Sequence, residues 1–400
     1  MTIQLDKIFD NFSKKSLFKD KFILQSNYTP ENIPHREKQI EQVATILAPA
    51  LRCERTSNLF IYGQTGTGKT LSTLFVKNEM LKRAKKEEIP LKIEYLNCKL
   101  KKVSDTEYRI LAELIKKLGG SVPATGLPTD QVYNKFLELV DGEKQMIILI
   151  LDEIDQAVNK ISDNFLYNLT RINSELSRSQ ISIVGISNDL KFLDSLDPRV
   201  RSSLSEEELI FPPYNALQLQ DILKNRASLA FKESVLEEGV LSKCAAYAAR
   251  EHGDARRALD LLRVSAEIAE RENSDKVKLI HVDLANEKID KDKIVSFVET
   301  SPKQFQIVLL SIIDLIEKKQ EKIFTGDVYN VYNELCLKAK AEVLTPRRVS
   351  DILAEFDMLG IITASVISKG RHGRTREIKL AIPEQLLNKI KITLIEALGV

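Results

Sequence analysis

The sequence predicts three successive domains: an α/β domain with a largely parallel sheet, an all-helical domain, and a domain that ends in a helix-turn-helix and a β-hairpin. Short apolar runs alternate with helical stretches from about residue 33 to residue 211, which is typical of a parallel sheet with crossover helices. After Pro212-Pro213 the strand signals stop and only helical periodicity continues. Near the C-terminus, two strand-like runs enclose a basic turn that contains glycines.

The first domain is expected to span residues 1–211, with residues 1–30 forming an N-terminal arm that packs on it. Its expected strands are the apolar runs 59–62, 93–97, 146–151, 181–186 and 208–211. Each run is short enough to be a buried strand, and helical stretches separate the runs. Pro212-Pro213 ends the domain because two consecutive prolines continue neither a strand nor a helix.

The second domain is expected to be all-helical over residues 212–290. Its expected helices are 217–231, 235–252 and 254–272. Residues 286–300 are charged and lack clear periodicity, which favours a linker. The third domain is expected to span residues 291–400. Its expected elements are helices at 302–318, 326–339 and 346–359, strands at 361–368 and 377–382, and a final amphipathic stretch.

Composition limits the possible function classes. Apolar residues make up 43% of the 400 residues, and no apolar run approaches the ~20 residues of a membrane span. The polar N-terminus, which contains an acidic residue, does not resemble a secretory signal. Four isolated cysteines and four histidines predict reduced thiols and no structural metal. A formal net charge of +2 neither favours nor excludes binding of nucleic acid, so any evidence for such binding must come from local clusters of charge.

A phosphate-binding loop is the strongest single motif. Residues 63–70 match the P-loop pattern G-x-x-x-x-G-K-[ST], with an additional glycine at 66, and they follow an apolar run and precede a helical one. Glycines let backbone N–H groups surround phosphates, Lys69 reaches the β- and γ-phosphates, and the Thr70 hydroxyl can ligate Mg²⁺. The residues expected to bind ATP or ADP here are Gly63, Gln64, Thr65, Gly66, Thr67, Gly68, Lys69 and Thr70. A glycine-rich turn without a ligand is the alternative.

Acidic residues follow the apolar run 146–151. Asp152 and Glu153 at the end of such a strand form a Walker B arrangement. Asp152 is the expected partner of Thr70 in holding Mg²⁺, a hard cation that prefers oxygen ligands. Glu153 is expected to polarise the attacking water. Asn188 ends the next strand-like run, where it can contact the γ-phosphate or orient water. Ordinary acidic and Asx turns are the alternatives.

Arginines in two further segments can reach a nucleotide. Arg199 and Arg201 follow a proline turn, and arginine stabilises the charge of a transferred phosphoryl group in cis or from a neighbour. A solvated surface loop is the equal alternative for this pair. Gly253 and Asp254 are expected to end one helix and cap the next. Arg256 then lies on the first turn of a helix that can reach back over the nucleotide.

The third domain contains a candidate DNA-reading helix. Thr345 is its expected N-cap and Pro346 its first residue, and apolar residues then recur along one face. The first turn exposes Arg347 and Arg348. With the preceding helix it predicts a helix-turn-helix, whose second helix presents its N-terminal residues to the major groove of DNA.

The hairpin after this helix concentrates positive charge. Between Ser365 and Leu380, five Lys or Arg residues stand against one glutamate. Glycines allow close approach to a surface, and arginines suit a groove or a phosphate contact. The hairpin residues expected to contact DNA are Lys369, Gly370, Arg371, His372, Gly373, Arg374 and Arg376. A protein-interaction module or a solvated hairpin is the alternative.

Together, the P-loop, the Walker B acids, the polar strand end and the helical domain resemble the AAA+ ATPases over about residues 35–285. By that resemblance Asn188 matches sensor 1, Arg256 matches sensor 2, and Arg199 or Arg201 matches the arginine finger. The resemblance also implies further residues of the ATP site: His35, Arg36, Tyr214 and Arg226.

An AAA+ core joined to a winged helix resembles the archaeal origin-binding replication initiators over essentially the whole chain. The matching segments are 34–37, 63–70, 152–155, 197–200 and 253–256. The resemblance implies ATP-dependent binding of double-stranded DNA at replication origins, recruitment of the replicative helicase, and slow ATP hydrolysis that acts as a switch. It also implies ATP or ADP and Mg²⁺ as cofactors, other initiator paralogues as partners, and a cytoplasmic, nucleoid-associated protein without a membrane partner. A DNA-touching insertion is implied within about 100–143, with an exposed loop at 124–129.

Three alternatives stay open. A signalling or transcription-regulating P-loop ATPase with a winged helix starts with a similar segment, but it lacks a Gly-Asp-x-Arg sensor in an all-helical lid. A clamp-loader-type ATPase works on DNA without a basic wing. A DNA-binding protein with a purely structural ATP site has no need of Glu153.

Overall fold

The computed structural model describes residues 16–25, 27–99, 106–123, 126–204, 206–318, 322–368, 374–382 and 384–399. The chain divides into two compact units, Met1–Asp283 and Leu284–Val400. The first unit contains the α/β domain and the helical lid, and the second contains the C-terminal domain. The predicted fold class is confirmed.

A five-stranded parallel sheet organises the α/β domain, with the strand order β2-β3-β4-β1-β5. Its strands are β1 (Asn58–Tyr62), β2 (Leu91–Asn97), β3 (Met146–Asp152), β4 (Gln180–Ser187) and β5 (Glu206–Ile210). Every residue of β3 is buried, as expected for a central strand with helices on both faces.

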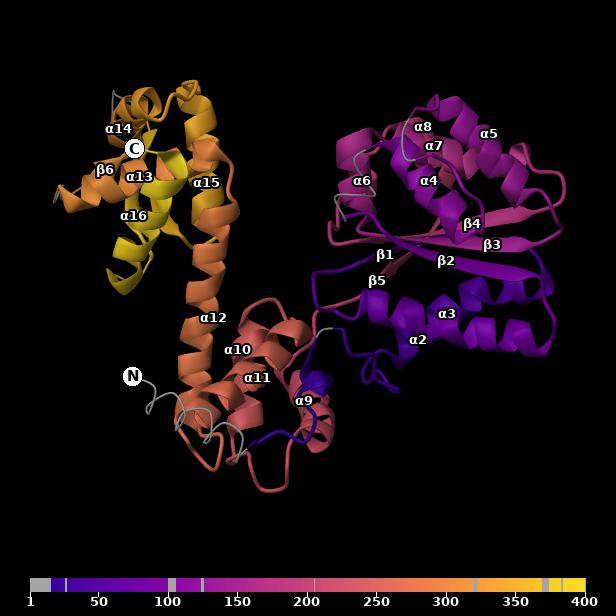
Figure 1. Ribbon diagram of the computed structural model, residues 1–400, viewed down its shortest axis with the longest axis horizontal. Coiled ribbons are helices and arrows are strands. Elements are labelled where there is room, and N and C mark those ends of the chain that lie inside the picture. The colour runs from indigo at the N-terminus through magenta and orange to yellow at the C-terminus, as the bar shows by residue number, and fades with distance from the viewer. Residues whose placement is uncertain are drawn as a thin grey trace. The chain divides into compact units, whose positions relative to one another are not determined.

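Helices cover both faces of this sheet (Figure 1). One face carries α2 (Glu37–Leu47) and α3 (Lys69–Lys86). The other carries α4 (Glu107–Lys117), α5 (Thr129–Val140), α6 (Ile154–Ile161), α7 (Asn164–Arg171) and α8 (Pro198–Leu204). The register pairs Asn97 with Asp152 and Tyr62 with Ser187, so the polar strand ends meet at one edge.

The lid is built from α9 (Ala216–Ala230), α10 (Val240–Arg250) and α11 (Ala255–Arg271). Asn215 caps α9 through a capping box with Gln218. Asp254 caps α11 as predicted, because its carboxylate accepts from the backbone N–H groups of Arg256 at 2.7 Å and Arg257 at 3.3 Å. One face of α11 is apolar and buried: Leu259, Leu262, Ala266 and Ala269.

The described part of the N-terminal arm packs on the lid, so for these residues the expectation that the arm packs on the first domain is wrong. Its described part contains a short 3-10 helix, η1 (Lys21–Leu24). Phe18 stacks on Phe231 with ring centroids 5.0 Å apart. The carbonyl of Ala230 at the end of α9 accepts from the N–H groups of Lys19 and Asp20. The arm therefore satisfies a carbonyl that the helix itself leaves without a partner.

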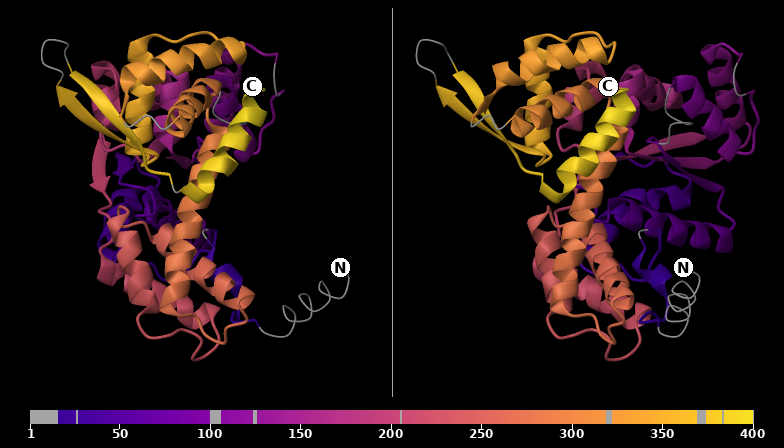
Figure 2. Two further views of the ribbon diagram at one scale, coloured as in Figure 1. Left: turned by 90° about the vertical axis from the view of Figure 1, so that its left-hand side faces the viewer. Right: turned by 60° about the vertical axis from the view of Figure 1, so that its left-hand side comes forward.

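The second unit is a helical domain with a three-stranded antiparallel sheet of order β6-β8-β7. Its elements are α13 (Lys303–Glu317), β6 (Ile323–Phe324), α14 (Thr325–Lys338), α15 (Pro346–Met358), β7 (Ile362–Ser368), β8 (Arg374–Leu380) and α16 (Glu384–Leu398). Strands β7 and β8 form the predicted hairpin and extend beyond the helices of their unit (Figure 2). The two-residue strand β6 was not predicted.

The predicted linker at 286–300 is wrong, because these residues are helical. They form most of α12 (Leu279–Thr300). Val298 is buried and Phe297 packs against the core of the C-terminal domain. Lys291 and Glu287 form an i,i+4 ion pair at 3.6 Å. The abundant charges that suggested a linker therefore lie on a solvated helix that also buries an apolar turn.

Candidate nucleotide site and DNA-binding unit

The P-loop folds tightly around its own lysine. Gly66 and Gly68 have positive φ angles of 70° and 89°, which glycine adopts without a steric penalty. Lys69 is 5% exposed. Its ammonium donates to the carbonyls of Gly63 at 2.6 Å and Gln64 at 2.8 Å, and to the side-chain oxygen of Asn188 at 2.9 Å. Burial lowers the pKa of Lys69 to about 8, against an opposing effect of Asp152.

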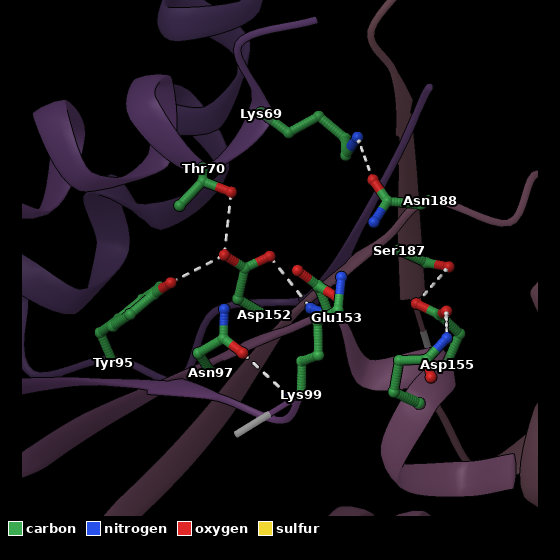
Figure 3. Close-up of polar contacts among 11 residues, drawn as sticks. Lys69, Thr70, Tyr95, Asn97, Lys99, Asp152, Glu153, Asp155, Ser187 and Asn188 are labelled. Atoms are coloured by element: carbon green, nitrogen blue, oxygen red, sulfur yellow. Dashed lines mark hydrogen bonds and ion pairs between the residues drawn. The ribbon is translucent and has the colours of Figure 1, made fainter. Parts of the chain in front are cut away.

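Asp152 is held by three hydrogen bonds (Figure 3). Its Oδ2 accepts from the Thr70 hydroxyl at 2.9 Å and from the Tyr95 hydroxyl at 2.8 Å. Its Oδ1 accepts from the backbone N–H of Glu153 at 3.0 Å. The hydroxyl of Thr70 and the carboxylate of Asp152 supply hard oxygen donors side by side, so these residues fit a magnesium ion.

Tyr95 is a residue of this site that sequence reasoning missed. It lies on β2, whose neighbour in the sheet is β3, the strand that ends at Asp152. Burial and the nearby Asp152 carboxylate raise the pKa of Tyr95, so its hydroxyl stays a donor. The run 93–97 shows a strand but not its neighbour, and only the strand order brings this phenol to the acid.

Glu153 has backbone angles of φ 53° and ψ 44°, in the left-handed region where a non-glycine residue is uncommon. Its carboxylate pairs with the ammonium of Lys99 at 3.4 Å. Asp155 accepts a hydrogen bond from the hydroxyl of Ser187 at 3.0 Å (Figure 3). The Walker B acids therefore have distinct partners, and Glu153 lies next to Asp152 at the edge where the P-loop also lies.

The lid reaches the P-loop directly. The backbone N–H of Ala255 donates to the carbonyl of Gly66 at 3.2 Å. Arg256 lies close enough to Lys69 for its charge to lower the pKa of that lysine. Two cations close together beside this loop suit a polyphosphate, so Lys69 and Arg256 fit the nucleotide that the P-loop predicts.

The other residues assigned to ATP divide into two groups. Arg36 is 2% exposed and its guanidinium lies 3.7 Å from the ring centroid of Tyr214, next to the P-loop. His35 pairs with Asp221 of α9 at 3.2 Å. Arg226 instead contacts the N-terminal arm: its guanidinium lies 4.4 Å from the ring centroid of Tyr28 and donates to the carbonyl of Ile23 at 3.2 Å. Its assignment to the nucleotide stays a prediction without a supporting contact.

Arg199 and Arg201 lie on α8 and pair with acids that precede this helix. Arg199 lies 3.8 Å from Asp197, and its side chain is 88% exposed. Arg201 lies 3.0 Å from Asp194. The structure therefore leaves both finger candidates on the surface.

The start of α15 has the predicted form. Thr345 caps it by accepting from the N–H of Arg348 at 3.4 Å, with Pro346 at the first position. Arg347 and Arg348 are exposed, and Arg348 lies 3.8 Å from Asp351. Arg376 of β8 donates to the carbonyl of Ser350 at 3.1 Å and so ties the hairpin to this helix.

The tip of the hairpin lies outside the described residues. This applies to five of the residues expected to contact DNA: Lys369, Gly370, Arg371, His372 and Gly373. The backbone of Arg374 is described but its side chain is not. Residues 100–105 and 124–125 of the expected DNA-touching insertion are also outside the described part. All these assignments stay predictions.

Comparison with known proteins assigns family models to three parts of the chain. Family models match residues 52–191 as an AAA domain, 220–287 as a Cdc6 AAA+ ATPase-type lid domain, and 296–389 as a CDC6 C-terminal winged helix domain. An ORC1-type DNA replication protein of Thermococcus onnurineus is 52% identical over 383 residues, covering 94% of this chain and 92% of its own. The chain belongs to the ORC1-type DNA replication protein family.

Other ORC1-type relatives agree with this assignment. ORC1-type DNA replication protein 1 of Archaeoglobus fulgidus is 52% identical, with 96% of this chain and 92% of the relative covered. Among solved structures, the Aeropyrum pernix ORC1 protein in complex with DNA matches with a TM-score of 0.83 and 42% identity, covering 96% of this chain and 98% of that one. This ORC1-type chain therefore has an AAA+ ATPase domain and a winged helix domain, as predicted.

Family membership excludes two of the three alternatives. An ORC1-type replication initiator is neither a signalling ATPase nor a clamp loader. Among the described residues, no helix is both long and apolar enough to cross a membrane.

Proposed function

We propose that this protein binds double-stranded DNA at replication origins in a manner controlled by ATP, and that it recruits the replicative helicase there. The observation that carries the proposal is the nearly full-length match to an ORC1 protein whose structure was solved with DNA. The nucleotide control is supported by the contact between the lid and the P-loop, since the carbonyl of Gly66 accepts from the lid.

The nucleotide would lie on the P-loop with its phosphates between Lys69 and Arg256. Thr70 and Asp152 would hold Mg²⁺, which neutralises phosphate charge when bound. Glu153 would polarise the attacking water and accept its proton, and Asn188 would orient that water. Arg199 or Arg201 would stabilise the transferred charge, in cis or from a neighbouring copy. Hydrolysis is proposed to be slow, because a binding protein needs a switch rather than turnover.

DNA would contact the start of α15 and the β7–β8 hairpin. Thr345, Arg347 and Arg348 would lie at the major groove, and the hairpin residues Lys369–Arg374 and Arg376 would reach the adjacent backbone or minor groove. A second contact through residues 100–143 would bend the duplex, so part of the specificity would be indirect. Initiator paralogues and the helicase are the proposed protein partners, and the proposed location is the cytoplasmic nucleoid.

Footprinting on fragments of the source genome tests this proposal. The full chain is titrated onto the fragments with ATP or with ADP. We expect one or a few discrete protected sites whose extent depends on the nucleotide. Uniform protection that ignores both sequence and nucleotide would overturn the proposal.

Glu153→Gln separates binding from turnover in the same assay. The variant keeps the shape of Glu153 but removes its basicity, so ATP binding and the ATP-form footprint are expected to persist while hydrolysis is lost. Unchanged hydrolysis would show that Glu153 does not polarise the water. A lost footprint with intact ATP binding would show that DNA binding needs turnover.

A further inference from the structure

The additional glycine of the P-loop is where the lid rests. The motif needs glycines at 63 and 68, but not at 66. A Cβ at Gly66 would lie 1.6 Å from Oδ1 of Asp254 and 3.0 Å from its Cα, so no larger residue fits while the lid is in this place. The N–H of Ala255 donates to the carbonyl of the same glycine. The beginning of α11 therefore packs directly on the P-loop backbone.

The next residue of the loop is held by Arg36. The Nε of Arg36 donates to the carbonyl of Thr67 at 2.8 Å, and Nη2 donates to the carbonyl of Pro212 at 2.5 Å. Nη1 donates to the carbonyl of His35 at 3.0 Å. One buried guanidinium thus joins the P-loop to the segment that leads into the lid.

Tyr214 completes this contact from the lid side. Its ring stacks on the Arg36 guanidinium, and its N–H donates to the carbonyl of Gly253 at 3.3 Å. A Cβ at Gly68 would lie 2.9 Å from the Tyr214 hydroxyl, and one at Gly253 would lie 2.4 Å from the Tyr214 carbonyl oxygen. Tyr214 therefore fits between the last glycine of the P-loop and Gly253, which precedes the N-cap of α11.

We propose that Arg36 is a positioning residue that couples the position of the lid to the P-loop, through a latch formed by Arg36, Gly66, Thr67, Tyr214 and Asp254. The inference rests on the proposed nucleotide control. Phosphates would bind the N–H groups of the same loop whose carbonyls the latch holds. A change in the loop therefore moves the lid, and Arg36 acts through backbone rather than through the nucleotide.

Only arginine can make this connection. Its planar fork carries donors that point in different directions, and here they reach carbonyls of three separate segments. A lysine keeps the charge but has a single nitrogen, which cannot hold Thr67 and Pro212 in the same geometry. Arg36→Lys therefore weakens the latch with little change in the charge next to the P-loop.

The test measures lid position and nucleotide affinity separately, on the full chain without DNA. Cys53 is the one cysteine of the chain that is not buried, so the background is Cys53→Ser. Dyes are attached at Gln42→Cys on α2 and Lys224→Cys on α9, both exposed positions. Energy transfer between the dyes is compared with ADP and with a non-hydrolysable ATP analogue, and affinity is measured with a fluorescent ADP.

We expect Arg36→Lys to keep ADP affinity within about threefold while the difference in energy transfer between the two nucleotides falls severalfold. Arg52→Lys is the matched control, because Arg52 is exposed and pairs only with nearby Glu54 among the described residues. Gly66→Ala, which forces Asp254 away from the loop, is expected to shift the transfer even with ADP bound. If Arg36→Lys does not fold, the Gly66→Ala variant alone tests whether the lid depends on its contact with the P-loop.

Three outcomes would overturn the latch. A large loss of affinity with an intact lid response would make Arg36 a nucleotide ligand. An unchanged lid response in both variants would show that no coupling passes through these residues. If the wild-type protein bound both nucleotides with the same lid position, the position of the lid would not depend on the nucleotide in the P-loop. Failure of the wild type to bind either nucleotide would instead refute the proposed ATP control.

Discussion

The nucleotide site and the DNA-facing end of α15 use their charges in opposite ways. Lys69 is 5% exposed, and every donor position of its ammonium is filled by an oxygen of the chain. Asp152 is likewise buried and accepts three hydrogen bonds. At the start of α15, the Arg348 side chain is 66% exposed and its partner Asp351 is 3.8 Å away. Arg347 is exposed as well, and no carboxylate in the described part of the chain pairs with it.

The difference indicates what each region selects. Buried and fully bonded groups hold fixed positions, so they discriminate by geometry and lose much when one partner is removed. Exposed arginines bind by releasing counterions from phosphates, so each adds a modest and salt-dependent amount. Substitutions should therefore be severe and specific in the nucleotide site, and small and salt-dependent at the DNA-facing helix.

The largest expected effect is that of Lys69→Ala. Removing a buried, charge-assisted donor should weaken ATP binding by at least about 100-fold. Nucleotide titration with a fluorescent ATP measures this loss. Lys82→Ala is the control, because Lys82 lies on the same helix but is exposed and pairs with Glu79. If Lys69→Ala kept an ATP affinity within threefold of the wild type, the P-loop would not be the site that binds ATP.

Tyr95→Phe should have a smaller and narrower effect. It deletes one hydrogen bond to Asp152 at almost constant volume, and loss of such an outer partner typically costs a metal site about 10-fold or more. We expect the Mg²⁺ concentration for half-maximal ATP binding to rise about 10-fold, while nucleotide affinity in excess EDTA is unchanged.

Tyr133→Phe is the matched control for this substitution. Its hydroxyl also donates to a carboxylate, that of Glu175 at 3.3 Å, but this pair is exposed and far along the chain from the P-loop. An equal shift in both variants, or a loss of affinity in EDTA, would show that Tyr95 supports the fold rather than the position of Asp152.

Tyr95 also marks where sequence reasoning stops. The P-loop and the Walker B acids follow local motifs, the resemblance to AAA+ ATPases assigned Asn188 and Arg256, and the parallel sheet brings the strand ends together by its own geometry. The order of the strands depends on long-range packing, so nothing in residues 93–97 tells that β2 lies beside β3. A tyrosine in a strand is ordinary, and its bond to Asp152 becomes visible only in the folded chain.

The contacts of Arg36 and of the N-terminal arm could not be predicted from the sequence for a related reason. A motif resemblance assigned Arg36 to the nucleotide, which stays a prediction, and the structure adds that its donors reach carbonyls of segments far apart in the sequence. The arm was placed on the domain that follows it in the chain, whereas Phe18 and its neighbours cover the end of α9. The local sequence pattern predicts whether a segment is a helix or a strand. The element on which that segment packs is decided by shape and by unsatisfied polar groups elsewhere in the chain.

The smallest expected effect, Arg347→Ala, gives the sharpest test of the comparison. If Arg347 neutralises one phosphate, the slope of log affinity against log salt should fall by about 1, with a similar loss on every duplex. Lys389→Ala, an exposed cation on α16, is the control and should leave the slope unchanged. A base contact would instead cost about 1–3 kcal/mol on the origin sequence alone. That result would show that the DNA-facing helix also discriminates by the fixed position of its side chains. The contrast with the nucleotide site would then no longer hold.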